Sequence, residues 1–301
     1  MSNIRIHNHC LSDVIYTVIT RVLLVFLVVI VLYPIYYVVV ASFSDPMYVN
    51  SGELLLWPKG FTLLGYKRVF ANSSIWIGYA NTILYAGAGT VIGLIATIMA
   101  GYALSRSDLP GRRVISLLLI FTMYFSGGMI PTYLVVKSLG LVNSRFYMII
   151  CSCLSCYNII VTCSFMESNI PRDLQDAAEI DGCGNGRFFV SIVVPLSKAV
   201  IAVIALYIVV AYWNSYFSAM LYLTDTNKYP LQLVLRNILL VASSAIDSTS
   251  ETDPTAAIQL QQAAQLIKYA AIVVSTVPII CAYPFAQKYF VKGVMIGAVK
   301  G

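Results

Sequence analysis

The chain has 301 residues, of which 59% are hydrophobic and 11% are charged, and its formal net charge at pH 7 is +6. A soluble domain typically carries about 25% charged residues, so this composition excludes an ordinary soluble domain and indicates a polytopic membrane protein. The 19 Lys and Arg residues are scattered one to three at a time, which excludes the concentrated basic patch of a nucleic-acid-binding domain.

Six apolar stretches follow one another along the chain, each long enough to cross about 30 Å of hydrocarbon as an α-helix. We therefore predict a single all-α transmembrane domain over residues 1–301. The predicted spans lie near residues 14–42, 78–104, 114–136, 146–166, 199–223 and 269–287. The first span is longer than the core of a signal peptide, which is about 7–15 residues, so we expect an uncleaved anchor. None of the stretches alternates in polarity as the strands of a membrane barrel do.

The basic residues predict the orientation of the spans. The short segment 105–113 holds three arginines, and both ends of the chain also carry Lys and Arg. Because basic residues favour the cytosolic side, we predict that both termini lie in the cytosol. Residues 43–77, 137–145 and 224–268 then face outward, and the segment 167–198 faces the cytosol.

Two of the outward segments have a recognisable character. FTLLGYKRVF at residues 61–70 predicts a short amphipathic helix lying along the membrane surface. The segment 224–268 is rich in Ser, Thr, Asp and Gln, and we expect a water-exposed loop with some helix after Pro254. This loop is much longer than the usual connection of about 4–6 residues, which favours a role in interaction over that of a passive connector.

Four cysteines fall in the fourth predicted span, at Cys151, Cys153, Cys156 and Cys163. The C-x-C-x-x-C spacing raises the hypothesis of a metal site. No His, Asp or Glu lies between these cysteines to complete a ligand set. We therefore favour the alternative that these small residues pack one helix against another.

The cores of the predicted spans hold no Asp, Glu, Lys, Arg or His. Ion-coupled transporters and voltage sensors need such residues at membrane depth, so energy for moving a solute would have to come from elsewhere. The polar residues in the spans are neutral and suit a path for a hydroxyl-rich solute, although each could instead join helices or lie at the interface. The candidates for the substrate path are Asn81, Tyr85, Tyr124, Asn158, Tyr212, Trp213, Asn214 and Tyr216.

The cytosolic segment 167–198 is acidic and glycine-rich in an otherwise apolar chain. Ser168 or Asn169 is expected to cap a helix, with Pro171 in its first turn. Gly182 is expected to end this helix, and a second short helix is predicted from about Asn185.

One face of the first helix is expected to be mostly small and apolar. It carries Leu174, Ala177, Ala178 and Asp181, which lie three or four residues apart. A slim helix of this kind fits into a groove on a partner protein. The alternative is a solvated loop without a partner.

The glycines at 182, 184 and 186 raise the question of a phosphate-binding loop. Such a loop follows a strand and, in the Walker form, ends in Lys followed by Ser or Thr. Here Arg187 and Phe188 occupy those places, and the neighbouring carboxylates repel phosphate. The sequence therefore disfavours a nucleotide site in this segment.

The same segment resembles the cytosolic E-A-A motif of importer permeases of the ABC transporter superfamily. Asp176-Ala177-Ala178 stands for E-A-A, Gly182 follows after three residues, Ile192 follows after nine more, and Val194-Pro195 closes the motif. Asp replaces Glu and Val replaces Leu, and the shorter carboxylate bears directly on how the loop meets its partner.

The resemblance extends over most of the chain. AYWNSYFSAMLYL at residues 211–223 is similar to the fifth span of sugar-importer permeases, and PFAQKYFVKGVMIGAVKG at residues 284–301 is similar to the tail of maltose-type permeases. Within the carbohydrate importers, the chain resembles the branch for oligosaccharides derived from complex polysaccharides.

This resemblance implies the type I importer permease fold and a place in a bacterial inner membrane. The implied partners are a second, different permease chain, two ATPase subunits, an extracellular solute-binding protein and a sugar. ATP and Mg would be held by the ATPase subunits, so the chain itself is expected to be no enzyme and to hold no cofactor or metal. The residues implied in docking to the ATPase are Leu174, Asp176, Ala177, Ala178, Asp181, Gly182, Arg187, Phe188, Ile192 and Pro195.

Other functions remain open at this point. The same architecture serves importers of other solutes, such as peptides. A stand-alone secondary carrier is disfavoured by the uncharged spans. An intramembrane enzyme is disfavoured because the two histidines, His7 and His9, both precede the first span.

Overall fold

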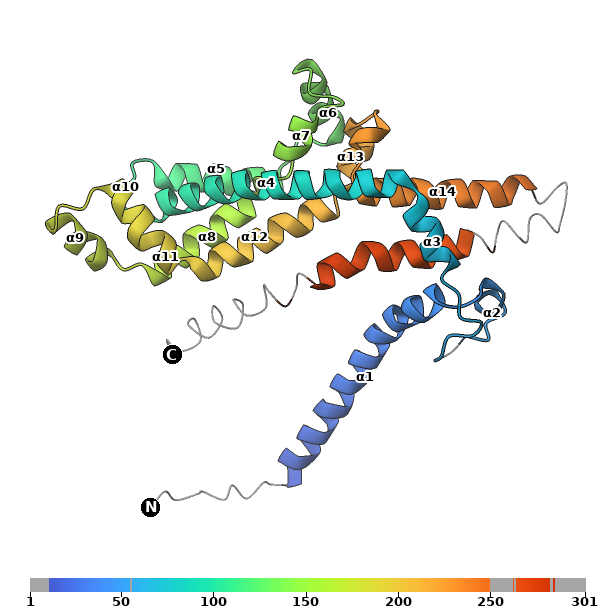
Figure 1. Cartoon of the computed structure of the whole chain (residues 1–301). Helices are drawn as coiled ribbons and strands as arrows, with labels where there is room; N and C mark the ends of the chain where they lie inside the picture. The colour runs from blue at the N-terminus through green and yellow to red at the C-terminus, as the bar shows by residue number, and fades with distance from the viewer. Residues whose placement is uncertain (1–10, 55, 250–261, 263, 282–283, 285–301) are drawn as a thin grey trace. The chain divides into compact units, whose positions relative to one another are not determined.

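The computed structural model describes residues 11–54, 56–249, 262, 264–281 and 284. Within these ranges the secondary structure is helical and holds no β-strand, which confirms the all-α prediction (Figure 1). The chain divides into two compact units, and each is described by itself. The first unit takes in the described residues up to Val69 and those from Val241 to Val274, and the second takes in Phe70–Leu240 and the described residues from Ser275 onward.

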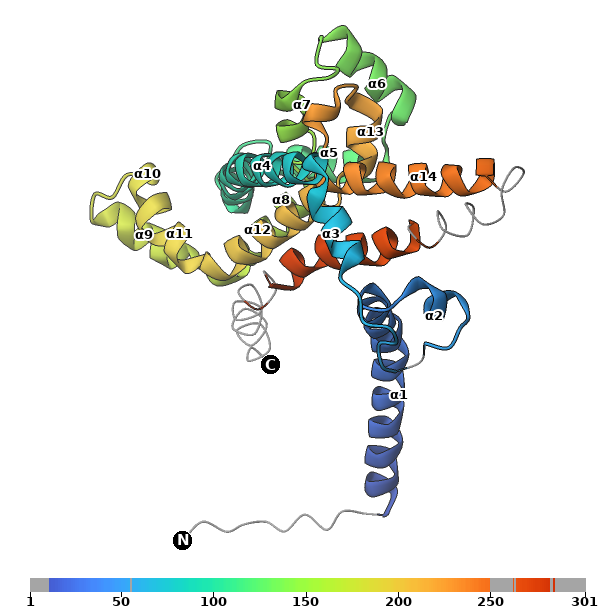
Figure 2. The same cartoon turned by 45° about the vertical axis from the view of Figure 1, so that its right-hand side comes forward.

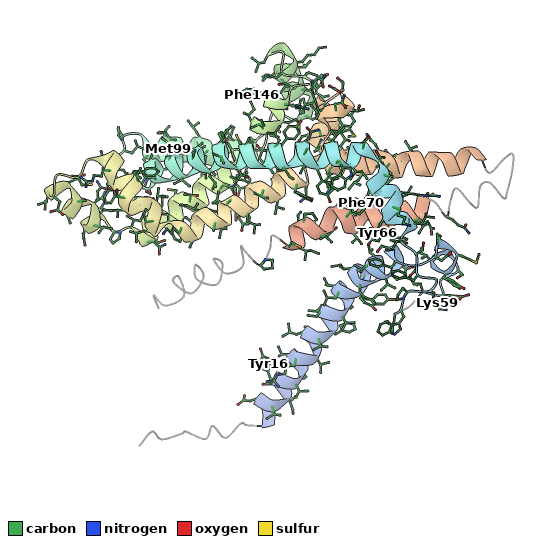
Figure 3. The ribbon with its side chains drawn as sticks, in the orientation of Figure 1. Tyr16, Lys59, Tyr66, Phe70, Met99 and Phe146 are labelled. Carbon is green, nitrogen blue, oxygen red and sulfur yellow. The ribbon has the colours of Figure 1, made fainter. Side chains whose placement is uncertain are left out.

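The first unit begins with α1 (Leu11–Ser42), which contains the first predicted span. From Val14 to Tyr36 its apolar side chains are exposed on every side, as Tyr16 illustrates with 73% of its surface exposed (Figure 3). A helix that is apolar on every side and covered by no protein is suited to a lipid environment.

The end of α1 packs against the loop that follows it. Asp45 caps the short helix α2 (Pro46–Asn50) by accepting a 2.9 Å hydrogen bond from the backbone N–H of Met47. The helix predicted within residues 61–70 is confirmed as α3 (Leu64–Ala71). At Gly65 a Cβ atom would lie 2.6 Å from the carbonyl oxygen of Leu266, so α3 approaches the helix Ala264–Cys281 as closely as glycine allows.

The second unit is built around α4 (Ser73–Ser105), the helix that carries the labelled Met99 in Figure 3. Helices α8 and α12 pack along α4, while α9, α10 and α11 gather at one of its ends (Figures 1 and 2). The other elements of the chain from α5 onward are α5 (Arg112–Tyr124), α6 (Met129–Ser138), α7 (Arg145–Ile150), α8 (Cys156–Asn169), α9 (Arg172–Ile180), α10 (Asn185–Phe188), the π-helical turn Phe189–Val193, α11 (Val194–Leu196), α12 (Lys198–Trp213), α13 (Tyr216–Tyr222), the 3₁₀ turn Thr226–Lys228 and α14 (Leu231–Thr249).

Glycines on one side of α4 let its neighbours approach. A Cβ on Gly89 would overlap the Tyr212 ring, and a Cβ on Gly93 would overlap the carbonyl oxygen of Cys153. A Cβ on Gly101 would lie 2.6 Å from Cγ2 of Thr162. Cys153 itself is buried in the core beside α4, in keeping with the packing role expected of the cysteines.

Three predicted spans are interrupted. The stretch 114–136 was expected to be one straight helix, and instead α5 and α6 meet at an angle of 110°. The break falls at Phe125–Gly128, where Gly128 has a φ of +86° that glycine adopts readily. The Gly-Gly pair followed by Pro131 is the sequence signal that a count of apolar residues overlooked.

The fourth and fifth predicted spans are also divided. Residues 151–155 separate α7 from α8 within 146–166, and Asn214 and Ser215 separate α12 from α13 within 199–223. The segment 224–268 is no simple loop, because it holds the 3₁₀ turn and the long helix α14. The helix expected after Pro254 falls mostly outside the described residues.

By length and composition, the described residues hold three single helices able to cross a membrane, and up to five spans if each bent pair counts as one. The three are Asp13–Ser42, Ser73–Ser105 and Ala264–Cys281. The last contains the described part of the predicted span 269–287, whose final residues lie outside the described ranges. Six spans therefore remain a prediction.

The glycine contacts lead to a matched pair of variants on α4. Gly93→Ala should lower the stability of the folded chain by about 1–3 kcal/mol, because the added methyl group meets backbone that cannot rotate away. Gly87→Ala is the control, since a Cβ there meets nothing within 4 Å. Thermal unfolding of the purified chain in detergent measures both, and equal melting temperatures would contradict the close packing at Gly93.

Candidate functional site

The acidic segment folds into a helix that stands at the end of α4. Helix α9 begins after Pro171, carries Asp173 in its first turn and ends at Ile180, with Asp181 as its C-cap. Negative charge in the first turn is favoured by the helix dipole. Gly182 follows with a φ of +73°, so the prediction that this glycine ends the helix is confirmed.

The predicted N-cap of α9 is wrong. Ser168 and Asn169 belong to the last turn of α8 and donate hydrogen bonds backward, to the carbonyl oxygens of Ser164 at 3.0 Å and Phe165 at 2.8 Å. Helix α8 therefore extends further than the predicted span. Extended backbone at Pro171 separates the two helices, and no side chain caps α9.

The second short helix predicted near Asn185 is confirmed as α10. The chain continues through the π-helical turn into α11, which contains Pro195 and ends at Leu196. It then turns by 79° into α12. Phe188 is buried in this elbow, so a docking residue implied by the resemblance lies in the interior of the chain.

Ala178 lies on the inner face of α9, the face that packs against the rest of the chain. This alanine is 7% exposed and packs in a cluster with Met166, Phe188 and Val193. Leu174, Ala177, Ala178 and Asp181 are therefore not presented together as one outward face, as had been expected. The small side chain at Ala178 lets α9 lie directly on the elbow.

The outer face of α9 consists of Asp173, Asp176, Ala177 and Ile180, spaced three or four residues apart and all exposed. Ile180 is the outstanding member, with 87% of its surface exposed. The prediction from sequence missed Ile180, although its position three residues after Ala177 places it on the same face. An exposed branched apolar side chain among carboxylates is a natural anchor for a partner's pocket.

Arg106 fastens α9 and α10 to the end of α4. Its side chain is only 13% exposed and donates hydrogen bonds to Asp108 at 2.7 and 2.9 Å and to Asn185 Oδ1 at 3.0 Å. A longer contact of 3.9 Å reaches Glu179, whose carboxylate accepts a 3.0 Å hydrogen bond from Gln175. One guanidinium thus contacts three segments of the chain.

The charge on Asp108 is stable near neutral pH. A hydrogen bond from Arg106 lowers the pKa of the Asp108 carboxyl, so Asp108 stays ionised at neutral pH. The contribution of this ion pair to the stability of the fold is lost only in acid, as the pH falls through that lowered pKa. Sequence reasoning did not single out Arg106. The available signal was an arginine directly after an apolar span.

A cavity of about 290 Å³ lies beneath α9. An ion pair between Arg112 and Glu167 joins the start of α5 to the end of α8 at its wall. Arg172 and Gln175 of α9 also line this cavity.

Several predicted substrate-path residues bind the chain's own backbone. Asn81 donates to the carbonyl oxygens of Asn227 and Tyr229 at 2.8 and 3.1 Å, and Tyr85 donates to that of Lys228 at 2.8 Å. Together with Thr82, which accepts a 2.9 Å bond from the N–H of Leu231, they hold the 3₁₀ turn and the start of α14 against α4. The side-chain amide of Asn81 and the hydroxyl of Tyr85 thus donate their hydrogen bonds to the backbone of this segment.

Of the other candidates, Tyr212 lies in the same buried cluster as Tyr85. Tyr212 donates to the carbonyl oxygen of Ile149 and Trp213 to that of Ser275, and both side chains are buried. Asn158 is also buried, whereas Tyr124 is exposed. The structure therefore does not bring the eight candidates together into one cluster.

Asn214 and Tyr216 lie exposed at the junction of α12 and α13. Arg236 of α14, which the sequence prediction missed, places its guanidinium carbon 5.8 Å from the centre of the Tyr216 ring. Its Nη1 lies 3.0 Å from Sδ of Met220. Among the described residues, no carboxylate forms an ion pair with Arg236.

Comparisons with known proteins give consistent results. The family described as binding-protein-dependent transport system inner membrane component matches residues 89–296. The chain is 41% identical to the polygalacturonan/rhamnogalacturonan transport system permease protein YtcP of Bacillus subtilis (strain 168), over 93% of this chain and 96% of that protein. It is 40% identical to protein LplC of the same organism, over 89% of each.

A solved structure is similar over nearly the whole chain. It is a chain of a bacterial ABC transporter involved in the import of the acidic polysaccharide alginate. The TM-score is 0.82 with 34% identity, covering 93% of this chain and 98% of that chain.

The Arg106 network predicts a change in local stability. Arg106→Gln should increase hydrogen exchange at the α9 amides about fivefold, because charge-assisted hydrogen bonds worth roughly 1 kcal/mol at a partly exposed site are lost. Arg187→Gln removes the same charge from an exposed position in α10 and serves as the control. Unchanged exchange in Arg106→Gln would show that α9 is held by the Ala178 packing alone.

Proposed function

The chain belongs to the family of binding-protein-dependent transport system inner membrane components, and we propose that it is the permease subunit of an ATP-driven importer of oligosaccharides. The observation that carries this proposal is helix α9, which stands at one end of the transmembrane helices with Ile180 exposed and with Arg106 anchoring its base. Such a helix is suited to insertion into a groove on a partner subunit.

We propose the following arrangement in the membrane. The chain crosses six times with both termini in the cytosol, and α5–α6 counts as one crossing in spite of its bend. The cytosolic loop 167–198 meets one of two ATPase subunits, which hold ATP and Mg. The external segment 224–268 meets a solute-binding protein, and a second permease chain completes the path. The chain itself does not hydrolyse ATP.

The docking surface in this proposal is the outer face of α9. Ile180 and Ala177 enter the apolar part of the ATPase groove, and Asp173 and Asp176 pair with basic groups at its rim. The other residues implied by the family motif act differently. Ala178 and Phe188 support α9 from beneath, and Gly182 ends the helix by adopting its positive φ.

Movement reaches the membrane through α4. Closure of the ATPase pair displaces α9, and Arg106 transmits the displacement because it contacts both α9 and α10. At the opposite end of α4, Asn81, Thr82 and Tyr85 hold the segment 227–231. One rigid helix thereby links the cytosolic loop to the outward side.

We further propose that the cargo is an acidic oligosaccharide. Two of the similar proteins are described as serving polygalacturonan/rhamnogalacturonan and alginate, and the second is called an acidic polysaccharide. Arg236 lies beside the exposed Tyr216 ring. An aromatic face that packs on a sugar ring and a guanidinium that pairs with its carboxylate suit a uronic acid.

Ile180 provides the first test of this proposal. Ile180→Glu should weaken binding of the ATPase at least about tenfold, because burying an isoleucine is worth roughly 1.5–3 kcal/mol and a buried glutamate adds a desolvation cost. Co-purification of the ATPase with the tagged chain measures this effect. Ser138→Glu introduces a glutamate at an exposed position on α6, outside the loop 167–198, and should retain the ATPase. Full retention by Ile180→Glu would exclude the outer face of α9 as the docking surface.

Arg236 tests the class of cargo. Arg236→Gln should raise the KM for an acidic oligosaccharide about tenfold or more, because a charged hydrogen bond worth roughly 1.5–3 kcal/mol is lost. Uptake by vesicles holding the whole transporter measures KM. Arg236→Lys keeps the positive charge and should raise the KM less than Arg236→Gln does. An unchanged KM in Arg236→Gln would remove this residue from the substrate path.

A further inference from the structure

The connection between α4 and α5 is surrounded by arginines. Arg106 and Arg112 form ion pairs with Asp108 and Glu167. Arg113 is exposed at the first turn of α5. Among the described residues, no carboxylate forms an ion pair with Arg113. Its charge is therefore available to a ligand.

A groove of about 620 Å³ starts at these arginines and follows α5. Beyond the arginines its wall is mainly apolar, and Leu117 is 63% exposed there. Arg113, Leu117 and Ile120 are spaced four and three residues apart and form one stripe on α5. The lining residues are Leu109, Gly111, Arg112, Arg113, Ser116, Leu117 and Ile120.

The direction of the groove matches the depth profile of a bilayer. Helix α5 begins at Arg112 and continues as an apolar helix toward Tyr124. From Arg113 to Ile120 the helix rises about 10 Å. In the membrane arrangement proposed above, on which this inference rests, the basic end lies at the level of the cytosolic lipid headgroups and the apolar stripe at the level of the acyl chains. A soluble nucleotide or free phosphate would leave that stripe uncovered.

We propose that this groove binds one anionic phospholipid of the cytosolic leaflet. Its phosphate lies beside Arg112 and Arg113, and one acyl chain lies along Ser116, Leu117 and Ile120. Charge complementarity selects this occupant, because basic sites at the cytosolic membrane surface attract anionic headgroups. The site is separate from the outer face of α9 and from Arg236, so it does not depend on the identity of the cargo.

The test measures lipid retained by the full transporter in nanodiscs, with phosphatidylglycerol and phosphatidylcholine of the same acyl chains as probes. Native mass spectrometry should detect one phosphatidylglycerol retained per chain and little phosphatidylcholine. Arg113→Gln should reduce this retention about fivefold or more. Leu117→Trp should also reduce it, because the indole fills the groove. Lys137→Gln, which removes a charge at an exposed position on α6, should not.

Two kinds of result would overturn the proposal. One is equal retention of the two lipids, or of phosphatidylglycerol by the original chain and Arg113→Gln. The other is efficient cross-linking of Leu117→Cys to the second permease chain, which would mean that protein fills the groove. Both readouts are independent of transport, so they remain informative if the proposed cargo or the docking surface is wrong.

Discussion

The close approach of neighbouring segments to α4 is the constraint on which the larger unit depends. At Gly93 the backbone of residue 153 occupies the space where a side chain would stand, and at Gly89 the Tyr212 ring does so. Because these glycines have no side chains, backbone and side chains of the neighbouring segments contact α4 directly. Helix α4 is about 50 Å long at the usual rise per residue.

The two ends of α4 make different polar contacts. At one end Asn81, Thr82 and Tyr85 bind the backbone of the segment 227–231, and at the other Arg106 binds α9 and α10. Asn81, Thr82 and Tyr85 are buried, so their bonds cannot easily exchange with water, whereas the partners of Arg106 are more exposed and contribute less per bond. In the proposed mechanism, these contacts let a chain whose spans lack ionisable core residues use energy that an ATPase partner supplies at the end of α4 that carries α9.

The sequence predicted features that depend on local chemistry. Gly182 ends α9 because only a residue tolerant of positive φ fits there, and the apolar length of α1 and α4 sufficed to place them. Prediction from the sequence failed where tertiary contacts decide which way a side chain faces. Nothing local shows that Ala178 faces inward or that Ile180 faces out, since this depends on where Phe188 packs. Likewise, nothing near Asn81 in the sequence shows that its amide binds the backbone of residues 227 and 229, which lie about 150 residues further along the chain.

The most direct test of the account is to purify the tagged full chain from its native membrane in mild detergent and identify what accompanies it. The account predicts a second permease chain and a P-loop ATPase, with solute uptake into vesicles only when ATP is supplied. A chain that emerges alone and still moves solute without ATP would contradict it, and α9 would then be an ordinary surface helix.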